Sequence, residues 1–506
     1  MRTKKAIINV SANMLSFLVV LIPNMIVRKV FLQSLGSDML GLNSLYSNII
    51  GWLSILEMGI GTTIIYSLYK PFAQDDKEII RSYIRFYGEF YKKVGIIILL
   101  LGIFISLFIE LFINGNVDTK IARTGFLVYL LNTLLSYMFT HKICILNVAQ
   151  EGYKVSIGTT ISKLVIFILQ MLMLNTFPNF IIYILIQVIV NFAYYIIINL
   201  HIRNKYAWIN EGKEELNSCE KKLLLKNVKA MFMHKIGSLV VLSTDNIIIS
   251  KFIGLMELGI YSNYYMVIDA LQSVVSKGLS GITASIGNML TDEDTDKAYK
   301  IHKKIFFMNF WVVSFIVISL YNTLNQFIVL WVGEKYLLET STFIVVLFNL
   351  YFSAMRGSVE KFQEGSGNFY QDRYAPLYEA AINIISSIIL AKYWGITGVF
   401  FGTLISNITV IFWTKPYVVY KYVFNKKINE YFKMYFMYLF VGLVPLVVTS
   451  YVTLPFKYSY NIKGFIINCM INIITINLLY TIMLFNTSEF KYYLNILKKV
   501  IKRKII

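Results

Sequence analysis

Ionisable side chains interrupt several long apolar segments of this sequence, and they are the residues best able to do chemistry. The clearest pattern lies in residues 257–290, where polar and small side chains recur at intervals of three and four on one helical face: Asp269, Ser273, Ser276, Ser280, Thr283 and Gly287. Serine and glycine alone would suit a seam between packed helices. Asp269 and the neighbouring Lys277 instead favour a water-filled passage, because charges are costly in lipid.

Other apolar segments carry embedded charges of both signs. The cations are Arg28, Lys163, Lys235, Lys277 and Arg356, and the carboxylates are Glu57, Asp245 and Asp269. Arg28 and Lys235 lie near segment ends, so snorkelling to the interface would also explain them. Arg356 precedes Glu360 and Glu364 at helical spacing, so a local ion-pair ladder is the alternative there.

Cations at several depths suit an anionic substrate that crosses the bilayer. The carboxylates either neutralise these cations or bind a coupling ion, H⁺ or Na⁺, and the sequence does not choose between the two roles. No cofactor is expected.

Motifs of common enzymes are missing from the sequence. There is no GxxxxGK[ST] phosphate loop, no HExxH and no GxSxG, and the three cysteines have no paired spacing. Three histidines, His141, His201 and His302, fall at inner helix ends, where solvated side chains are expected. A membrane polymerase or glycosyltransferase commonly places acidic residues or a large folded loop outside, whereas the outward loops here are short. This favours transport over catalysis.

Composition sets the protein class. The 506 residues are 57% hydrophobic and 15% charged, against about 25% charged in soluble domains. The formal charge of +20 sits in short clusters between apolar runs, as in the cytoplasmic loops of membrane proteins, and not in a patch for nucleic acid.

The apolar runs predict an all-α polytopic membrane protein with about fourteen transmembrane helices. The expected spans are 6–31, 41–67, 94–114, 125–149, 154–176, 178–201, 229–252, 257–290, 304–325, 337–358, 374–392, 395–418, 432–453 and 464–486. With the N-terminus inside, 36 of the 48 Lys and Arg face the cytoplasm, so both termini are predicted to be cytoplasmic. The basic tail, residues 491–506, is expected on the anionic inner leaflet.

A weak internal repeat appears at a spacing of 218 residues, which aligns Gly36 and Gly41 with Gly254 and Gly259. It predicts two six-helix lobes, at 1–203 and 229–425, joined by a cytoplasmic linker at 204–228. Residues 426–506 add two helices and the tail. Helical composition alone is the alternative explanation of the match.

Five blocks resemble bacterial polysaccharide flippases, the O-antigen and capsule repeat-unit translocases of the multidrug/oligosaccharidyl-lipid/polysaccharide exporter superfamily. They are LGLNSLYSNIIGWLSILEMGIGTTIIYSLYKPFA (40–73), KNVKAMFMHKIGSLVVLSTDNIIIS (226–250), YSNYYMVIDAL (261–271), ITASIGN (282–288) and QDRYAPLYEAAINI (371–384). The likeness covers residues 1 to about 425.

The resemblance implies two lobes around a central cavity and an alternating-access transporter in the bacterial plasma membrane. The implied substrate is an undecaprenyl-diphosphate-linked oligosaccharide, moved from the inner to the outer leaflet for surface polysaccharide export. It adds Arg373 as a candidate substrate-binding residue. Implied partners are membrane lipids and a polysaccharide polymerase with its chain-length machinery. A drug-type exporter, a membrane enzyme of polysaccharide assembly, and a flippase for peptidoglycan or teichoic-acid precursors are the alternatives.

Overall fold

The computed structural model of the chain describes residues 2–505 except 58–59, 116, 212–214, 219, 223, 225–227, 229–242, 291–293 and 458. All regular secondary structure in these residues is helical. The chain divides into two compact units, residues 1–259 (unit 1) and 260–506 (unit 2).

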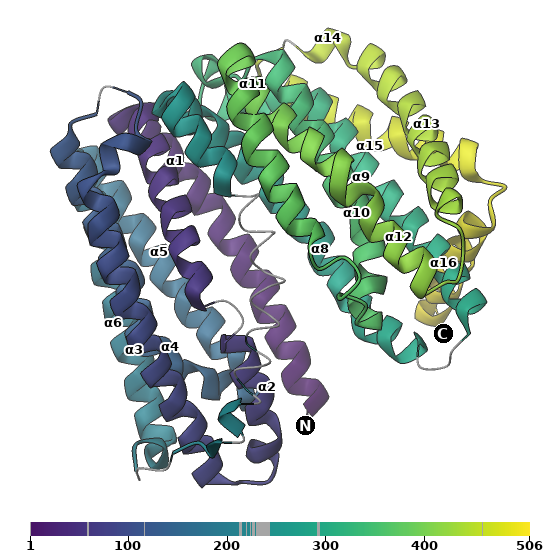
Figure 1. The fold of residues 1–506 in the computed structure, drawn as a ribbon. Helices are drawn as coiled ribbons and strands as arrows, with labels where there is room; N and C mark the ends of the chain where they lie inside the picture. The colour runs from purple at the N-terminus through teal and green to yellow at the C-terminus, as the bar shows by residue number, and fades with distance from the viewer. Residues whose placement is uncertain are drawn as a thin grey trace. The chain divides into compact units, whose positions relative to one another are not determined.

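Unit 1 is a bundle of long helices (Figure 1). Its elements are α1 (Arg2–Leu53), η1 (Ser54–Glu57), α2 (Ile60–Ala73), α3 (Lys77–Leu107), η2 (Ile109–Phe112), α4 (Thr119–Val148), α5 (Gly152–Thr176), α6 (Phe180–Lys205), η3 (Ala207–Asn210) and η4 (Ile249–Ile253). Asp76, Asp118 and Asn179 cap α3, α4 and α6 by accepting hydrogen bonds from first-turn backbone N–H groups. Helix α1 packs on α5, and α4 packs on α3 and α6.

Helix α1 contains the first predicted span and about half of the second, and the two parts join at Gly36. Gly36 has φ 83°, a conformation that favours glycine. Before this turn, Asn9 donates to the Gln150 carbonyl at the inner end of the bundle. After it, Tyr46 donates to the Ala122 carbonyl near the outer start of α4, 2.5 Å away. The chain therefore turns back at Gly36, as the predicted outer hairpin requires.

Glycines permit a close backbone approach between this hairpin and residues 254–259, which also belong to unit 1. A Cβ added at Gly41 would lie 1.9 Å from the Leu255 carbonyl oxygen, and one at Gly259 would lie 2.1 Å from the Ser37 carbonyl oxygen. At the spacing of 218, Leu255 corresponds to Ser37 and Gly259 to Gly41. The two contacts are therefore reciprocal, which supports the predicted repeat.

Unit 2 contains the remaining helices. They are α8 (Leu255–Leu290, whose first turn belongs to unit 1), α9 (Thr295–Trp331), η5 (Glu334–Tyr336), α10 (Thr340–Ser366), α11 (Ala375–Ser406), η6 (Asn407–Ile411), α12 (Phe412–Tyr422), α13 (Ile428–Val452), α14 (Leu454–Lys457), α15 (Ile462–Leu484) and α16 (Ser488–Ile505). Trp394 and Gly395 leave helical geometry inside α11 and separate the spans predicted at 374–392 and 395–418.

Buried amides attach α13 and α15 to α9. Asn322 of α9 donates to Thr449 of α13 at 3.0 Å and to Asn472 of α15 at 2.8 Å, and Asn468 donates to Gln326 at 3.0 Å. Such interhelical hydrogen bonds hold helices together where lipid provides no hydrophobic driving force. The two additional helices are thus tightly joined to the rest of unit 2.

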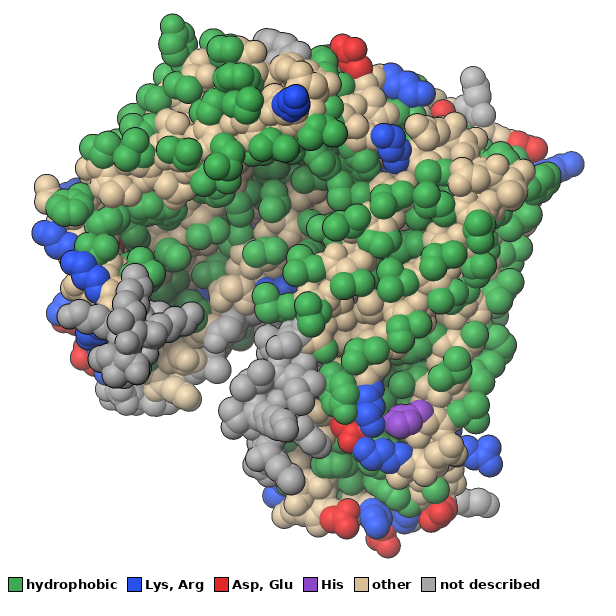
Figure 2. Space-filling view, turned by 180° about the vertical axis from the view of Figure 1, so that it is seen from behind, with side chains coloured by type: hydrophobic (Ala, Val, Ile, Leu, Met, Phe, Trp, Pro, Cys, Tyr) green, Lys and Arg blue, Asp and Glu red, His purple; other side chains and the backbone are tan. Residues whose placement is uncertain are grey.

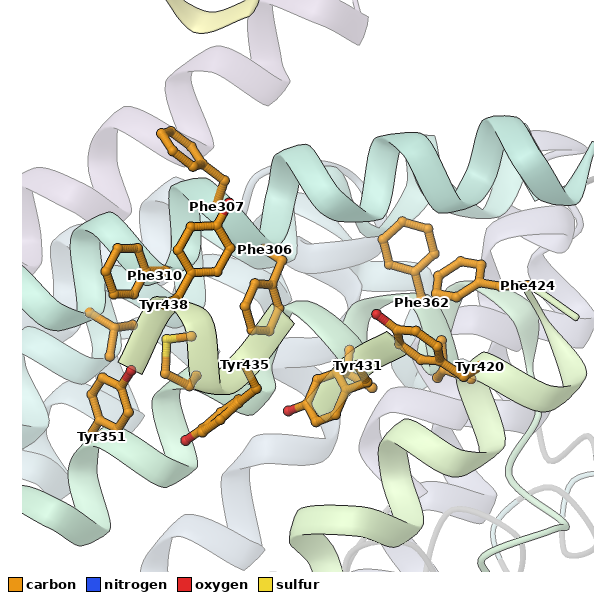
Figure 3. Close-up of a cluster of buried hydrophobic side chains, with 14 of the residues drawn as sticks. Phe306, Phe307, Phe310, Tyr351, Phe362, Tyr420, Phe424, Tyr431, Tyr435 and Tyr438 are labelled. Carbon is orange, nitrogen blue, oxygen red and sulfur yellow. The ribbon is translucent and has the colours of Figure 1, made fainter. Parts of the chain in front are cut away.

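The inner half of unit 2 contains an aromatic core, drawn in Figure 3. Its rings belong to α9, α10, α12 and α13 and to the residues that follow α12: Phe306, Phe307, Phe310, Tyr351, Phe362, Tyr420, Phe424, Tyr431, Tyr435 and Tyr438. Phe310 and Tyr438 stack with ring centroids 4.8 Å apart. His302 is 0% exposed against this core, so its predicted solvated position is wrong.

The described residues contain nine helices long and apolar enough to cross a membrane. Eleven of the fourteen predicted spans overlap these helices, because α1 and the run from α11 to α12 each overlap two; α4 and α8 overlap two more. Most of the remaining predicted span, residues 229–242, lies outside the described part of the chain. Figure 2 shows hydrophobic side chains over the helix flanks and charged ones mainly near helix ends. The prediction of an all-helical multi-pass membrane protein is confirmed.

Candidate functional site

Glu57 ends η1 and is half-buried in unit 1. Its carboxylate is hydrogen-bonded by Tyr91 of α3 and Tyr137 of α4. The Tyr137 hydroxyl also lies 3.3 Å from Ser54 Oγ. Three elements that are distant in sequence therefore converge on one carboxylate, which is how a protein holds a titratable group in a fixed position.

A second tyrosine extends this network. Tyr87 donates to the Tyr91 hydroxyl at 3.1 Å, and their rings meet edge to face with centroids 4.5 Å apart. A Cβ added at Gly61 would lie 2.8 Å from Tyr87 Oη, so glycine makes room for this hydroxyl. We call Ser54, Glu57, Tyr87, Tyr91 and Tyr137 the Glu57 cluster. Glu57 was predicted from the sequence as an embedded carboxylate, whereas the tyrosines were not, although Tyr87 and Tyr91 stand at i, i+4.

A basic pocket of about 450 Å³ opens beside the cluster at the inner ends of α3 and α4. Its lining includes Arg81, Arg85, Lys92 and Lys142. His141 also lines it, one turn after Tyr137 and against Gly88, and is only half-exposed. The solvated side chain predicted for His141 is thus partly enclosed, whereas His201 is exposed as expected.

Arg28 and Lys163 occupy different surroundings in unit 1. Arg28 is half-buried in α1 and interacts electrostatically with Tyr183 of α6. Phe31, one turn further along α1, meets the Tyr183 ring with centroids 4.8 Å apart. Lys163 lies near the middle of α5 and is exposed.

Two candidate site residues, Lys235 and Asp245, lie near residue 240, and the structure describes only Asp245. Lys235 lies outside the described residues. Asp245 lies in a helical segment, 243–248, and is 9% exposed. The neighbouring Asn246 donates to Asn48 of α1 at 3.1 Å. This hydrogen bond attaches the helical segment that carries Asp245 to the second part of α1.

The predicted stripe on α8 retains two exposed charges. Asp269 and Lys277 are both exposed, two turns apart on the helix, and they interact electrostatically. Ser273 and Thr283 of the same face are half-buried.

Arg356 is engaged in local contacts. Its Nε lies 2.7 Å from Glu360 Oε1, and its Nη1 donates to Asn407 at 3.1 Å. Glu364 instead pairs with Lys361 at 2.7 Å. The ion-pair alternative raised from the spacing thus accounts for the first step of the ladder and not for the second.

Arg373 is exposed in the connection between α10 and α11. Its guanidinium carbon lies 3.7 Å from the Tyr370 ring centroid and 4.7 Å from that of Tyr374, and Nη1 donates to the Tyr370 carbonyl. Cation–π stacking presents the guanidinium to the surface with donors left for an anion.

Among the described side chains, no group of three or more His, Cys, Asp and Glu residues is placed to hold a metal ion. The arrangement instead offers one enclosed carboxylate cluster and several separate cations. Such a set can bind protons or monovalent ions and steer an anion.

Comparison with solved structures finds other chains of the same fold. No protein-family model matches the sequence, and no curated protein matches it. The structure is similar to that of the lipid II flippase MurJ in an inward closed conformation, with a TM-score of 0.71 and 17% identity, over 94% of this chain and 99% of that one. It is also similar to an inward-facing MATE family multidrug transporter of the MOP superfamily (TM-score 0.61, 13% identity, 82% and 98% coverage). A Vibrio cholerae MATE transporter, VcmN, gives a TM-score of 0.57 at 14% identity, with 84% and 98% coverage. The chain therefore has the fold shared by this lipid II flippase and these MATE transporters.

Proposed function

We propose that this protein is a flippase that moves an undecaprenyl-diphosphate-linked oligosaccharide across the bacterial plasma membrane by alternating access. The observation that carries the proposal is the match to a lipid II flippase over 94% of the chain. The MATE matches cover 82–84%, about the share that precedes α13. The part of the chain outside the flippase match is too short to hold both α13 and α15, whereas the MATE matches can leave both helices out.

Exposed charges in the middle of apolar helices support a polar cargo. Lys163, Asp269 and Lys277 are exposed halfway along α5 and α8. A lone charge facing hydrocarbon is costly, so such residues border water or a charged ligand. The excess of cations suits a diphosphate, to which Arg28, Lys235, Arg356 and Arg373 are further candidate contacts.

Coupling to an ion is part of the proposal. Glu57, Asp245 and Asp269 are the candidate H⁺ or Na⁺ sites; Asp245 is the most buried of them, and Glu57 is the one that lies among tyrosine hydroxyls. A polysaccharide polymerase and its chain-length machinery are the proposed downstream partners, since O-antigen, capsule or other exported repeat units must be joined outside.

The test is reconstitution of the full chain in proteoliposomes loaded with a lipid-linked oligosaccharide. We expect the sugar to become accessible to a membrane-impermeant glycosidase outside the vesicles, in a time-dependent manner. Loss of Lys163, Lys277 and Arg373 by alanine substitution should slow this appearance, whereas Lys335→Ala, at the outer end of unit 2, should not. Transport of organic cations in place of the oligosaccharide would identify a drug-type exporter instead.

Genetic deletion gives an independent measurement. In a strain without redundant flippases, surface polymer should disappear while its lipid-linked unit accumulates in the inner leaflet. Unchanged surface polymer together with loss of peptidoglycan or teichoic-acid synthesis would assign the protein to that precursor.

A further inference from the structure

A groove of about 730 Å³ lies between α8, α9 and α16, wholly within unit 2. Its deeper walls are apolar and include Val275 and Ile282 of α8 and Ile305 and Val312 of α9. Gly278 keeps the α8 wall open, because a Cβ added there would meet no atom within 4 Å. The volume falls in the range of about 300–1,000 Å³ that is typical of ligand sites.

The inner end of the groove is polar and cationic. Lys297 lines it, and Lys304 Nζ lies 3.8 Å from the ring centroid of Tyr492, another lining residue. Tyr493 donates to the Lys304 carbonyl at 3.1 Å. Helix α16 is thus docked on α9 and completes the rim.

The groove lies at the level of the inner leaflet and has about the same length along the membrane normal. The positive charges of α9 end at Lys304, which marks the headgroup level, and the apolar lining continues to Val312. Lys297 and Val312 are separated by about 22 Å along a helix, from the rise per residue. Half of a hydrocarbon core is about 15 Å. The groove therefore runs from the headgroups through most of one leaflet.

Charge near the rim is predominantly positive. Over residues 294–305 and 485–499 there are seven lysines and three acidic residues: Lys297, Lys300, Lys303, Lys304, Lys491, Lys498 and Lys499 against Asp294, Asp296 and Glu489. Asp294 caps α9, and Asp296 pairs with Lys426 at 3.1 Å. Asp292 and Glu293 lie outside the described residues. The rim favours an anion over a zwitterion.

We propose that this groove binds one anionic phospholipid of the inner leaflet. An acyl chain fills the space beside Gly278 and Ile305, and the phosphate lies at Lys297 and Lys304. The site needs neither the cargo nor the transport cycle. Because Lys277 follows the groove residues Val274 and Val275 on α8, an occupied groove also supports the helix that carries the polar stripe.

The test is lipid binding to the purified, delipidated full chain by native mass spectrometry. The two probes are phosphatidylglycerol and phosphatidylcholine with identical acyl chains. We expect phosphatidylglycerol to bind at least fivefold more tightly, and each of Lys297→Gln and Lys304→Gln to weaken it by about fivefold. Gly278→Phe should block both lipids by filling the groove.

Matched controls separate the site from general charge. Lys457 lies over the Tyr321 ring at 5.0 Å, as Lys304 lies over Tyr492, but it is at the outer end of unit 2. Lys457→Gln should leave binding unchanged. Because Lys304 also packs on Tyr492, the melting temperature of Lys304→Gln is measured in the absence of lipid. If Lys304→Gln unfolds, the test rests on the lipid affinities of Lys297→Gln, at an exposed side chain, and of Gly278→Phe.

Three results would overturn the proposal. One is equal binding of the two lipids. Another is a preference for phosphatidylglycerol that survives Lys297→Gln and Gly278→Phe, which would place the lipid elsewhere. The last is displacement of phosphatidylglycerol from the same groove by an equal concentration of a polyprenyl phosphate. The groove would then be a binding site for the lipid part of the cargo. Transport failure without a change in these affinities would count against the proposed function alone.

Discussion

Both units gather tyrosines towards their inner ends, and they use them in opposite ways. In the Glu57 cluster of unit 1, the hydroxyls of Tyr87, Tyr91 and Tyr137 have polar partners and converge on a carboxylate. In the aromatic core of unit 2, Tyr420 and Tyr435 are buried and their hydroxyls have no hydrogen-bond partner among the described residues (Figure 3). One residue type thus builds a polar site in one unit and a packed scaffold in the other.

This difference between the units depends on which groups lie opposite the tyrosine hydroxyls. In unit 1, Tyr91 and Tyr137 face a glutamate, and a hydrogen bond to a charge is stronger than one between neutral groups. Tyr87 donates to the Tyr91 hydroxyl. Phenylalanine rings face the unit 2 tyrosines, so what these residues contribute is ring area and stacking. We therefore expect variants of the Glu57 cluster to change function and variants of the aromatic core to change stability.

The largest expected effect is loss of packing in the aromatic core. Phe306 is 0% exposed, and Phe306→Ala should lower the free energy of unfolding by about 3–5 kcal/mol. Phe436→Ala, on the 44%-exposed side chain of α13, is the matched control and should cost much less. Unfolding of the purified variants in detergent measures both. Similar losses for the two would contradict the packed-scaffold role.

Glu57→Gln should reduce ion-driven transport at least tenfold, or about 1.4 kcal/mol in activation free energy, while the protein still folds. The amide keeps the shape of the side chain and removes its titratable charge. Export by proteoliposomes under an imposed H⁺ or Na⁺ gradient measures the effect. Glu89→Gln, at an exposed ion pair with Arg85 on α3, is the control. Full activity of Glu57→Gln would reduce the cluster to a structural role.

Paired Tyr→Phe substitutions test the contrast directly. Tyr137→Phe removes a hydroxyl that is bonded to Glu57 and should cost about 1–2 kcal/mol and change the pH dependence of transport. Tyr435→Phe removes a hydroxyl without a described partner and should be neutral or stabilising by about 1 kcal/mol. Thermal unfolding and pH profiles of the two variants give the comparison. Stability changes of the same sign in the two variants would contradict the proposed difference between the Glu57 cluster and the aromatic core.

His302→Phe asks whether the aromatic core needs a polar group at all. Both ring nitrogens of His302 are buried and have no hydrogen-bond partner among the described residues. Replacing them with carbon should leave stability unchanged or raise it by about 1 kcal/mol, with transport unaffected. A fall in transport at full stability would reveal a functional histidine inside the scaffold.

The smallest expected effect is the loss of the ion pairs of Glu151, which stabilise unit 1. Burial alone raises the pKa of Glu151, but hydrogen bonds and ion pairs with Lys205 and Lys154 outweigh it, and the pKa lies below its ordinary value of 4.5. A depressed pKa adds stability above pH 4.5, and this contribution is lost as pH falls through the folded-state value. Glu151→Gln should cost at most about 1 kcal/mol at pH 7.

The difference between this variant and the natural protein should disappear at low pH. Glu110→Gln, at a more exposed pair with Arg123, is the control for removing one paired carboxylate and should cost less at pH 7. Melting temperatures of both variants and of the natural protein, measured across pH 3–7, test this prediction.

The topology could be predicted from the sequence because it depends on local properties. Apolar run length sets the spans, and the side on which Lys and Arg collect sets the orientation. The hairpin at Gly36 was also foreseeable, since glycine takes up left-handed backbone geometry that other residues avoid. Helical spacing correctly paired Arg356 with Glu360, because i and i+4 are neighbours on any helix.

What only the tertiary structure decided is which distant side chains meet. Nothing in the local sequence joins Glu57 to Tyr91 and Tyr137, because η1, α3 and α4 come together only through packing. The same holds for His302, expected in solvent yet enclosed by rings from α9, α10 and α12, and for the groove that α16 closes against α8 and α9. Sequence alone determined how this chain crosses the membrane, since transfer of each segment into lipid is a sum over its own residues. Packing in three dimensions determined the sites, since each depends on residues that the chain keeps far apart.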